Sequence, residues 1–303
     1  MEYRTLPHGG EKISVIGMGS SVVGEQKEAD IIRTVEYALD VGINYFDMAG
    51  GHATIFPAYG KALEGRRKEA MLQVHFGANY TTGEYGWTTN LETIKRSVDW
   101  QLKNLKTDYI DFGFIHCIDE AADWEKVCAA GTWTFLQKLK EEGVVHHLGL
   151  STHTPKIANM VLDTGLIDMM MFSINPAYDY RHGEFAIGSV DERMALYRRC
   201  EAEGVGISVM KAFSGGQLLN EKTSPFQRAL TEYQCIQYAL DKPGVLTVLP
   251  GVRNENDLHR ILGFLNAVPE ERDYSILGTF TPHDAAGIPR VYHLNFLYRF
   301  LED

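Results

Sequence analysis

The chain of 303 residues contains few cysteines and no excess of basic residues. Its four cysteines are scattered and form no Cys-x-x-Cys pair, which argues against a disulfide framework or a cysteine-bound metal cluster. The formal net charge of -11 and the pI near 5.5 exclude the basic face that nucleic-acid binding requires. We therefore expect reduced thiols, a cytoplasmic location and no nucleic-acid partner.

Long apolar runs are absent as well. No segment approaches the roughly 20 apolar residues that a membrane-spanning helix needs, and residues 1–5 do not begin an apolar signal segment. Hydrophobic residues nevertheless make up 45% of the chain, which is enough for a full core. We expect a soluble protein without a membrane partner, in which residues 1–303 form one domain.

Short β-branched or apolar runs alternate regularly with helix-like stretches. Eight such units in series are typical of an α/β protein of the (β/α)8 TIM barrel type. The first strand-to-helix turn lacks a G-x-G-x-x-G loop, so an open doubly wound sheet is the weaker alternative. The clearest helix has apolar residues on one face at Ile94, Val98, Leu102 and Leu105. The expected strands are 14–17, 44–48, 71–76, 109–116, 145–151, 169–174, 206–211 and 245–249.

The ends of the predicted barrel carry different features. Residues 3–13, with a turn at Gly9-Gly10, predict a short N-terminal β-hairpin that closes the barrel bottom. Three longer connections, 78–91, 118–132 and 177–190, follow strands three, four and six, on the face where barrel active sites are built. One or two of their aromatic residues are expected to line a pocket. These aromatic residues are Tyr80, Tyr85, Trp87, Trp124, Tyr178 and Tyr180.

Four polar residues stand at or just after the ends of three consecutive predicted strands. They are Asp47, His52, His75 and His116. Because neighbouring strands of a barrel lie about 4.8 Å apart, side chains from their ends can converge on one point. One carboxylate and three imidazoles form either a proton-transfer site or a metal site, and the residues by themselves leave both open.

Four segments carry recognisable motifs. Residues 46–49 read Phe-Asp-Met-Ala, 60–67 read Gly-Lys-Ala-Leu-Glu-Gly-Arg-Arg, 115–116 read Ile-His, and 250–251 read Pro-Gly. In these motifs the chain resembles the aldo-keto reductases over nearly its whole length. It looks closest to a branch that usually carries a C-terminal iron–sulfur module. Residues 285–303 contain no cysteine, so we expect no cluster.

The resemblance implies reduction of carbonyl groups with NAD(P)H through a catalytic tetrad of Asp, Tyr, Lys and His. Asp47 and His116 match the Asp and the His, whereas His52 stands at the Tyr position and His75 at the Lys position. In the family a phenol held by a lysine protonates the nascent alkoxide, and an imidazolium is able to perform the same transfer. Tyr59 falls on the following helix, where the family has Leu, and receives no role.

The resemblance also implies a nicotinamide site. Ser151 and Asn175 occupy the positions that bind the carboxamide. At three other positions the chain lacks the residue that the family uses to contact the cofactor. Met171 stands at the nicotinamide position, residues 260–261 stand at the adenine position, and Asp257 stands where the extra phosphate of NADP is often held. Small-residue loops are expected to receive the pyrophosphate at a helix N-terminus. Their residues are Ser214, Gly215, Gly216, Gly251, Val252, Arg253 and Asn254.

Three functions follow from these observations. The preferred one is an oxidoreductase acting on a carbonyl or hydroxyl group of a small substrate. The second is a lyase, isomerase or epimerase in which His52, His75 and His116 bind a divalent metal such as zinc or manganese. The third is a binding protein that kept the barrel without the chemistry. Aromatic and polar loop residues would suit a small polyol or glycoside.

Overall fold

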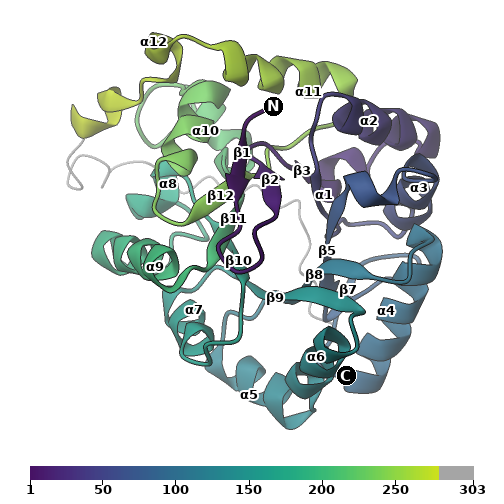
Figure 1. Ribbon diagram of the computed structural model, residues 1–303. Helices are drawn as coiled ribbons and strands as arrows, with labels where there is room; N and C mark the ends of the chain where they lie inside the picture. The colour runs from purple at the N-terminus through teal and green to yellow at the C-terminus, as the bar shows by residue number, and fades with distance from the viewer. Residues whose placement is uncertain (280–303) are drawn as a thin grey trace.

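Eight parallel strands form a nearly closed barrel, and helices surround it (Figure 1). The computed structural model describes residues 1–279. Neighbours in the sheet follow the order β3-β4-β5-β8-β9-β10-β11-β12, so the predicted (β/α)8 fold is confirmed. The strands are β3 (Met18–Gly19), β4 (Tyr45–Asp47), β5 (Met71–Phe76), β8 (Ile110–Ile115), β9 (Val145–Thr152), β10 (Met169–Ser173), β11 (Gly206–Met210) and β12 (Val245–Val248).

The barrel closes between β12 and the segment that precedes β3. Ile16 forms a parallel bridge with Val248, and the Gly17 amide donates to the Val248 carbonyl oxygen at 2.9 Å. Gly17 permits this close approach, because a Cβ there would lie 2.6 Å from a methyl carbon of Leu249. Of the expected single strand 14–17, Ser14 ends β2, and residues 15–17 lie between β2 and β3, where Ile16 forms only the isolated bridge.

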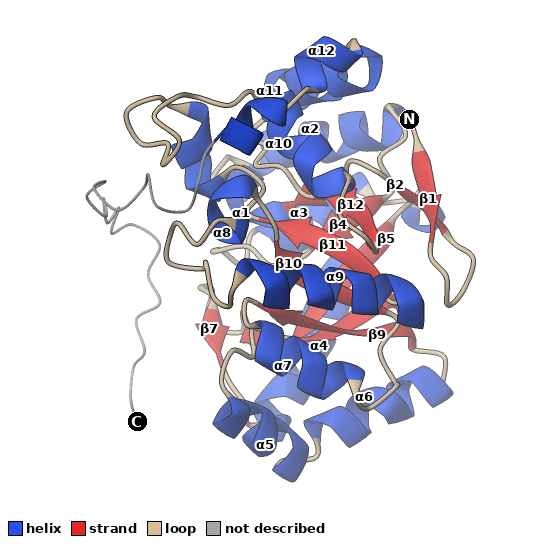
Figure 2. Ribbon diagram, turned by 90° about the vertical axis from the view of Figure 1, so that its left-hand side faces the viewer, coloured by secondary structure: helices blue, strands red, loops and turns tan. Residues whose placement is uncertain are grey.

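The N-terminal hairpin closes one end of the barrel. Strands β1 (Tyr3–Thr5) and β2 (Lys12–Ser14) pair antiparallel, as predicted. Leu6 and Ile13 are fully buried and join a cluster that includes Phe112 and Leu246 from the barrel strands. The hairpin lies at the end of the barrel opposite to β7 (Figure 2), and this leaves the other end available for chemistry.

Three helices begin at local start signals. α4 (Leu91–Leu105) buries Ile94 and Val98 and is capped by the Asn90 side chain. α7 (Pro155–Leu162) has proline in its first turn, and α11 (Glu255–Leu262) is capped by Asn254. None of the helices described within residues 1–279 combines the length and the apolar character needed to cross a bilayer. The others are α1 (Ser20–Val23), α2 (Glu28–Asp40), α3 (Ile55–Ala62), α5 (Ala121–Ala129), α6 (Thr132–Glu141), α8 (Pro176–Asp179), α9 (Val190–Glu203), α10 (Glu232–Leu240) and α12 (Pro269–Arg272), with 3-10 turns η1 (Arg67–Glu69), η2 (Ser214–Leu219), η3 (Gly263–Asn266) and η4 (Ser275–Thr279).

The three longer connections have structure of their own. Residues 78–91 contain an antiparallel ribbon of β6 (Ala78–Asn79) and β7 (Gly86–Trp87). Most of 118–132 is helix α5 rather than loop, because Trp124 and Val127 turn inward and join the core. Trp124 packs edge-on against Trp133 at 5.6 Å between ring centroids, so this aromatic residue serves packing.

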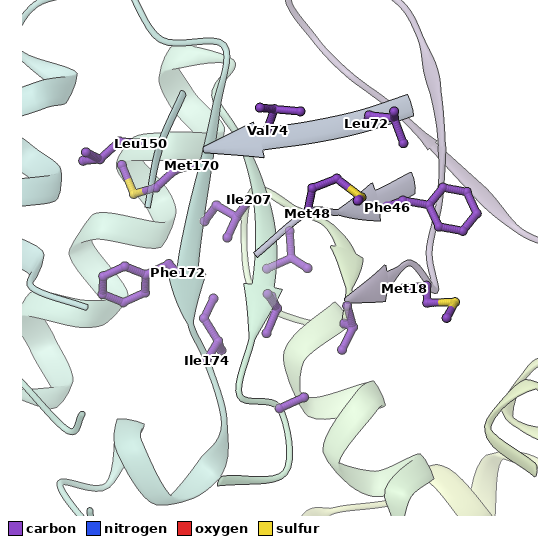
Figure 3. Packing of buried hydrophobic residues seen from close by; sticks show 14 of the residues in the cluster. Met18, Phe46, Met48, Leu72, Val74, Leu150, Met170, Phe172, Ile174 and Ile207 are labelled. Carbon is purple, nitrogen blue, oxygen red and sulfur yellow. The ribbon is translucent and has the colours of Figure 1, made fainter. Parts of the chain in front are cut away.

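Alternation along β5 separates core residues from site residues. Leu72 and Val74 belong to the large apolar cluster between strands and helices, and Figure 3 shows them with other members of that cluster. Gln73 and His75 alternate with them and therefore point to the opposite face, into the barrel. A strand buried on both faces carries its polar groups inside the barrel, where they require partners.

Candidate active site

The structure brings Asp47, His75 and His116 together at the C-terminal ends of β4, β5 and β8. His75 Nε2 lies 2.6 Å from Asp47 Oδ1, and His75 Nδ1 lies 2.8 Å from His116 Nδ1. His75 is fully buried, and Asp47 and His116 are nearly so. The parallel register explains this cluster, because His75 follows Gln73, which pairs with Asp47 across the β4–β5 ladder.

Tyr85 continues the cluster at its outer end. Its hydroxyl lies 2.9 Å from His116 Nε2, and the two rings are 5.7 Å apart. Tyr85 stands just before β7, and its amide donates to the Gly51 carbonyl oxygen at 3.1 Å. The neighbouring Trp87 donates its indole N–H to the His116 carbonyl oxygen at 3.1 Å. Sequence reasoning noted Tyr85 only as a loop aromatic residue, because the tetrad alignment places the phenol on another segment.

The His52 side chain points to the surface, unlike those of His75 and His116. Its side chain is 47% exposed, and its Nδ1 lies 3.1 Å from the Glu84 carboxylate at the surface. The segment after β4 pairs with the β6–β7 turn, and an isolated antiparallel bridge joins His52 to Glu84. Among the described residues, His52, His75 and His116 do not supply three ligand atoms within 4.8 Å of one another. The geometry corrects the expectation that these four predicted side chains share one point.

Gln73 holds the inner end of the cluster. Its Nε2 donates to Asp47 Oδ1 at 2.8 Å, and its Oε1 accepts a hydrogen bond from Tyr45 and another from Ser208 Oγ at 3.1 Å. These contacts orient the amide so that its N–H groups face the carboxylate. Gln73 is fully buried, so a reversed amide would leave unsatisfied groups in the barrel at a cost of about 1–3 kcal/mol each.

The pattern of donors and acceptors assigns the protons. Asp47 accepts from His75 Nε2, which makes His75 Nδ1 the acceptor of the proton on His116 Nδ1. His116 Nε2 then accepts the hydroxyl proton of Tyr85. Burial lowers the pKa of His116 well below its ordinary value, and repulsion from His75 and His153, when these rings are protonated, lowers it further. The His116 ring is therefore neutral near neutral pH. The result is one directed chain from phenol to carboxylate.

A second polar group lies beside the first, at the ends of β8 and β9. Asp119 accepts from the His153 amide at 2.6 Å, from His153 Nδ1 at 2.9 Å and from Thr152 Oγ1 at 2.9 Å. Burial acts to raise the pKa of Asp119, but the hydrogen bonds from His153 and Thr152 outweigh it and lower the pKa. Burial lowers the pKa of His153, which is also neutral. The family alignment did not mark this pair.

The two residues expected at the carboxamide lie at the ends of β9 and β10. Ser151 Oγ accepts from the Cys117 amide at 2.7 Å and donates to no other group within residues 1–279. Asn175 caps α8 by accepting from Tyr178, and its Nδ2 donates to the Lys211 carbonyl oxygen at 2.7 Å. The Asn175 side chain also interacts with the Tyr178 phenol. The Ser151 hydroxyl is the donor at these two positions that fits the amide oxygen of a nicotinamide.

The expected pyrophosphate loops leave space for an anion. Ser214, Gly215 and Gly216 adopt φ values of 51°, 64° and 88° in succession, and a Cβ at either glycine would meet nothing within 4 Å. On the other loop, Asn254 caps α11, while the Arg253 amide donates to an Asp257 oxygen at 3.2 Å. Gly251 and Val252 lead into this cap. The loops thus fit a pyrophosphate, but a carboxylate stands in the first turn of the helix.

Surface hollows lie elsewhere on the molecule. One of about 430 Å³ is lined in part by Arg4 and Leu246, and one of about 400 Å³ by Tyr180 and Tyr274. The position of the candidate active site is therefore given by its hydrogen-bonded side chains and not by these hollows.

The molecule is a parallel βα-barrel whose strand ends hold a buried acid and two buried histidines. Residues 15–234, more than half of the chain, match the model of the Aldo/keto reductase family. The chain belongs to this family and is an aldo-keto reductase-type enzyme. The metal-dependent and binding-only alternatives are not favoured.

Relatives support this assignment along the chain. The uncharacterized oxidoreductase YqkF of Bacillus subtilis is 27% identical over 297 residues, which cover 88% of this chain and 92% of the relative. L-galactose dehydrogenase of Arabidopsis thaliana is 30% identical over 191 residues, 56% of each chain. The structure of an aldo-keto reductase from Bacillus halodurans superposes with a TM-score of 0.72 at 24% identity, covering 90% of this chain and 94% of that one. That likeness concerns the fold.

Proposed function

We propose that this protein interconverts a carbonyl and a hydroxyl group on a small substrate, with Tyr85 as the group that exchanges a proton with the substrate oxygen. A nicotinamide cofactor, when bound, supplies or accepts the hydride. The proposal rests on the chain of hydrogen bonds Tyr85–His116–His75–Asp47, in which each contact measures 2.6 to 2.9 Å. It assigns the role of the family phenol to a residue from a different loop.

In the oxidation direction, the substrate hydroxyl gives its proton to the Tyr85 oxygen. The Tyr85 proton moves to His116 Nε2, and the His116 Nδ1 proton moves to His75 Nδ1. The positive charge then resides on His75, beside the Asp47 carboxylate at 2.6 Å. Reduction runs the same steps in reverse, so that Tyr85 protonates the alkoxide oxygen.

His75 and Asp47 thereby take the place of the family's Lys and Asp. An imidazolium next to a buried carboxylate is stabilised by charge and hydrogen bond together. Unlike a lysine, a histidine carries two nitrogens that can each hold a proton, so it connects two partners in line. His75 is therefore positively charged only while the chain of hydrogen bonds holds the proton taken from the substrate.

We infer that NAD(H) is the preferred cofactor. Ser151 and Asn175 stand at the positions expected for a carboxamide, and the Ser214–Leu219 turn and the cap at Asn254 leave room for a pyrophosphate. Burial acts to raise the pKa of Asp257, but hydrogen bonds from Arg260 and the Arg253 amide outweigh it and lower the pKa. A carboxylate at this helix start repels the extra phosphate of NADP.

The substrate is proposed to be small and hydroxylated. Two similar proteins are named for such compounds, L-galactose dehydrogenase and the L-glyceraldehyde 3-phosphate reductase of Escherichia coli. None of the four cysteines forms a disulfide within residues 1–279, which supports a cytoplasmic location.

The test is the change Tyr85→Phe, assayed with NADH and a panel of small aldehydes and ketones. We expect kcat to fall by about 10²–10⁴-fold, the usual contribution of a general acid. Tyr80→Phe is the matched control, because Tyr80 lies 6.0 Å away, ring to ring, and bonds the Gly50 carbonyl oxygen instead. Undiminished turnover by the Tyr85→Phe protein would remove Tyr85 from the mechanism.

A further inference from the structure

We propose that Lys211, His153 and Phe185 form a substrate-anchoring subsite for an anionic group, a carboxylate or a phosphate, with a neighbouring hydroxyl. The inference rests on the proposed oxidoreductase function and adds the class of substrate. The three residues come from separate segments: the end of β11, the end of β9, and the connection between α8 and α9. We name this set the anchor subsite.

Lys211 supplies an ammonium without a carboxylate partner. Within the described part of the chain, no acidic oxygen lies within 4.0 Å of its Nζ, although Asp119 and Glu184 contribute attractive charge from a greater distance. Its Nζ lies 4.1 Å from the Phe185 ring centroid. Burial is the main influence on its pKa, which is lowered. A sheltered ammonium that lacks an ion pair gains strongly from a ligand anion.

The backbone of Lys211 aims this side chain. Its φ of 58° is in the left-handed region, which is uncommon for a residue with a side chain. The Asn175 side chain fixes that conformation by donating to the Lys211 carbonyl oxygen at 2.7 Å. Strained backbone that a buried hydrogen bond holds in place is typical of positions that serve a site.

His153 supplies an unoccupied acceptor. Its Nδ1 is committed to Asp119 at 2.9 Å, and its Nε2 is buried with no hydrogen-bond partner among the described residues. His153 is 3% exposed, so a lone pair on Nε2 needs a partner that the fold does not provide. A ligand hydroxyl can donate to it.

Phe185 joins the two groups into one subsite. The His153 ring lies 4.4 Å from the Phe185 ring, and Lys211 Nζ lies 4.1 Å from the same ring. The subsite adjoins the relay, because a proton on His153 would repel a proton on His116. A substrate held here by its anion and a nearby hydroxyl directs its remaining carbon chain along the barrel mouth.

A metal ion is the competing occupant of this region. Cys117, Asp119 and His153 offer ligand atoms within 4.8 Å of one another. Both Asp119 oxygens already accept hydrogen bonds, and the Lys211 ammonium lies in the same electrostatic neighbourhood. A second cation would be repelled there, so the observations favour an anion.

The experiment compares matched substrates that differ in charge. The probes are D-glucose with D-glucuronate for the carboxylate, and glyceraldehyde with glyceraldehyde 3-phosphate for the phosphate. We expect kcat/KM to be at least about tenfold higher for one of the anionic probes than for its neutral counterpart. Lys211→Met should lower that anionic value by about ten- to a hundredfold, mostly through KM, and change the neutral value by less than about threefold.

Lys242→Met is the matched control. Lys242 Nζ also stacks on an aromatic ring, at 3.6 Å from the Tyr238 centroid, and burial also lowers its pKa, but it lies by a different hollow. Lys211→Arg should retain much of the preference for the anion. Equal kcat/KM for the charged and neutral members of both pairs would overturn the proposal.

A binding measurement separates this inference from the proposed function. Calorimetry with D-glucuronate and inorganic phosphate, using the full chain without turnover, should detect binding that Lys211→Met abolishes. If no probe turns over but this binding is present, the redox assignment fails and the anchor subsite stands. If turnover occurs without charge preference or anion binding, the subsite fails alone. Stoichiometric zinc that is lost in a His153→Phe protein would assign the region to a metal instead.

Discussion

The Nδ1 atoms of His75 and His116 lie 2.8 Å apart, so the two rings share one proton between them. Zinc would need nitrogen ligands at about 2.0–2.1 Å in tetrahedral directions, which two nitrogens facing each other so closely do not offer. The remaining nitrogens of the pair contact Asp47 and Tyr85. The contact is therefore the one that the proposed proton relay requires.

The first prediction concerns His52. Changing His52 to Ala should alter kcat/KM by less than about threefold and stability by no more than about 1 kcal/mol, because its partner Glu84 forms an exposed ion pair. Dialysis against EDTA should leave turnover unchanged. Loss of activity in both experiments, with recovery on adding zinc or manganese, would restore the three-histidine metal hypothesis.

The second prediction concerns the dependence of stability on pH. The pKa of His116 in the folded protein is lowered by burial, whereas the unfolded chain titrates near the ordinary value of about 6.5. Below that pH the unfolded state binds more protons, so the free energy of unfolding falls as the pH drops towards the folded-state pKa. Urea unfolding should show that the wild type loses more stability than His116→Gln between about pH 7 and about pH 5. Parallel pH profiles for the two proteins would contradict this.

The third prediction concerns cofactor choice. Calorimetric titration should show NADH binding about tenfold more tightly than NADPH, because the Asp257 carboxylate opposes the additional phosphate. Asp257→Asn should reduce that difference. Asp163→Asn, which alters an exposed acid paired with Arg199, should leave it unchanged. Tighter binding of NADPH by the wild type would show that another group receives the phosphate.

The fourth prediction concerns barrel closure. Gly17→Ala should lower the free energy of unfolding by about 1–3 kcal/mol, since the new Cβ would lie 2.6 Å from a Leu249 carbon and 3.0 Å from the Tyr45 carbonyl oxygen. Gly19→Ala is the control, because a Cβ there meets nothing within 4 Å and φ is -84°. Equal midpoints of urea unfolding for the two variants would contradict a tight closure.

The sequence by itself determined the barrel and the strand-end position of three site residues. Buried parallel strands are continuous apolar runs, so β5 and β8 could be located within a residue or so of their ends. Alternation with period two then directed Gln73 and His75 inward. Asp47, His75 and His116 converge because β4, β5 and β8 are neighbouring parallel strands, and the pairing of such strands places their C-terminal ends side by side.

Only the tertiary structure decided what the loops contribute. His52 and Tyr85 both lie outside the strands that form the barrel, and the pairing of residues 51–53 with 83–85 sends one to the surface and the other onto His116. The expectation of no iron–sulfur cluster concerned 285–303, which lie outside the described residues. A strand residue is oriented by its neighbours in sequence, whereas a loop residue is oriented by contacts with segments distant in sequence. For that reason the motifs located Asp47, His75 and His116, whereas only the fold placed the Tyr85 phenol beside His116.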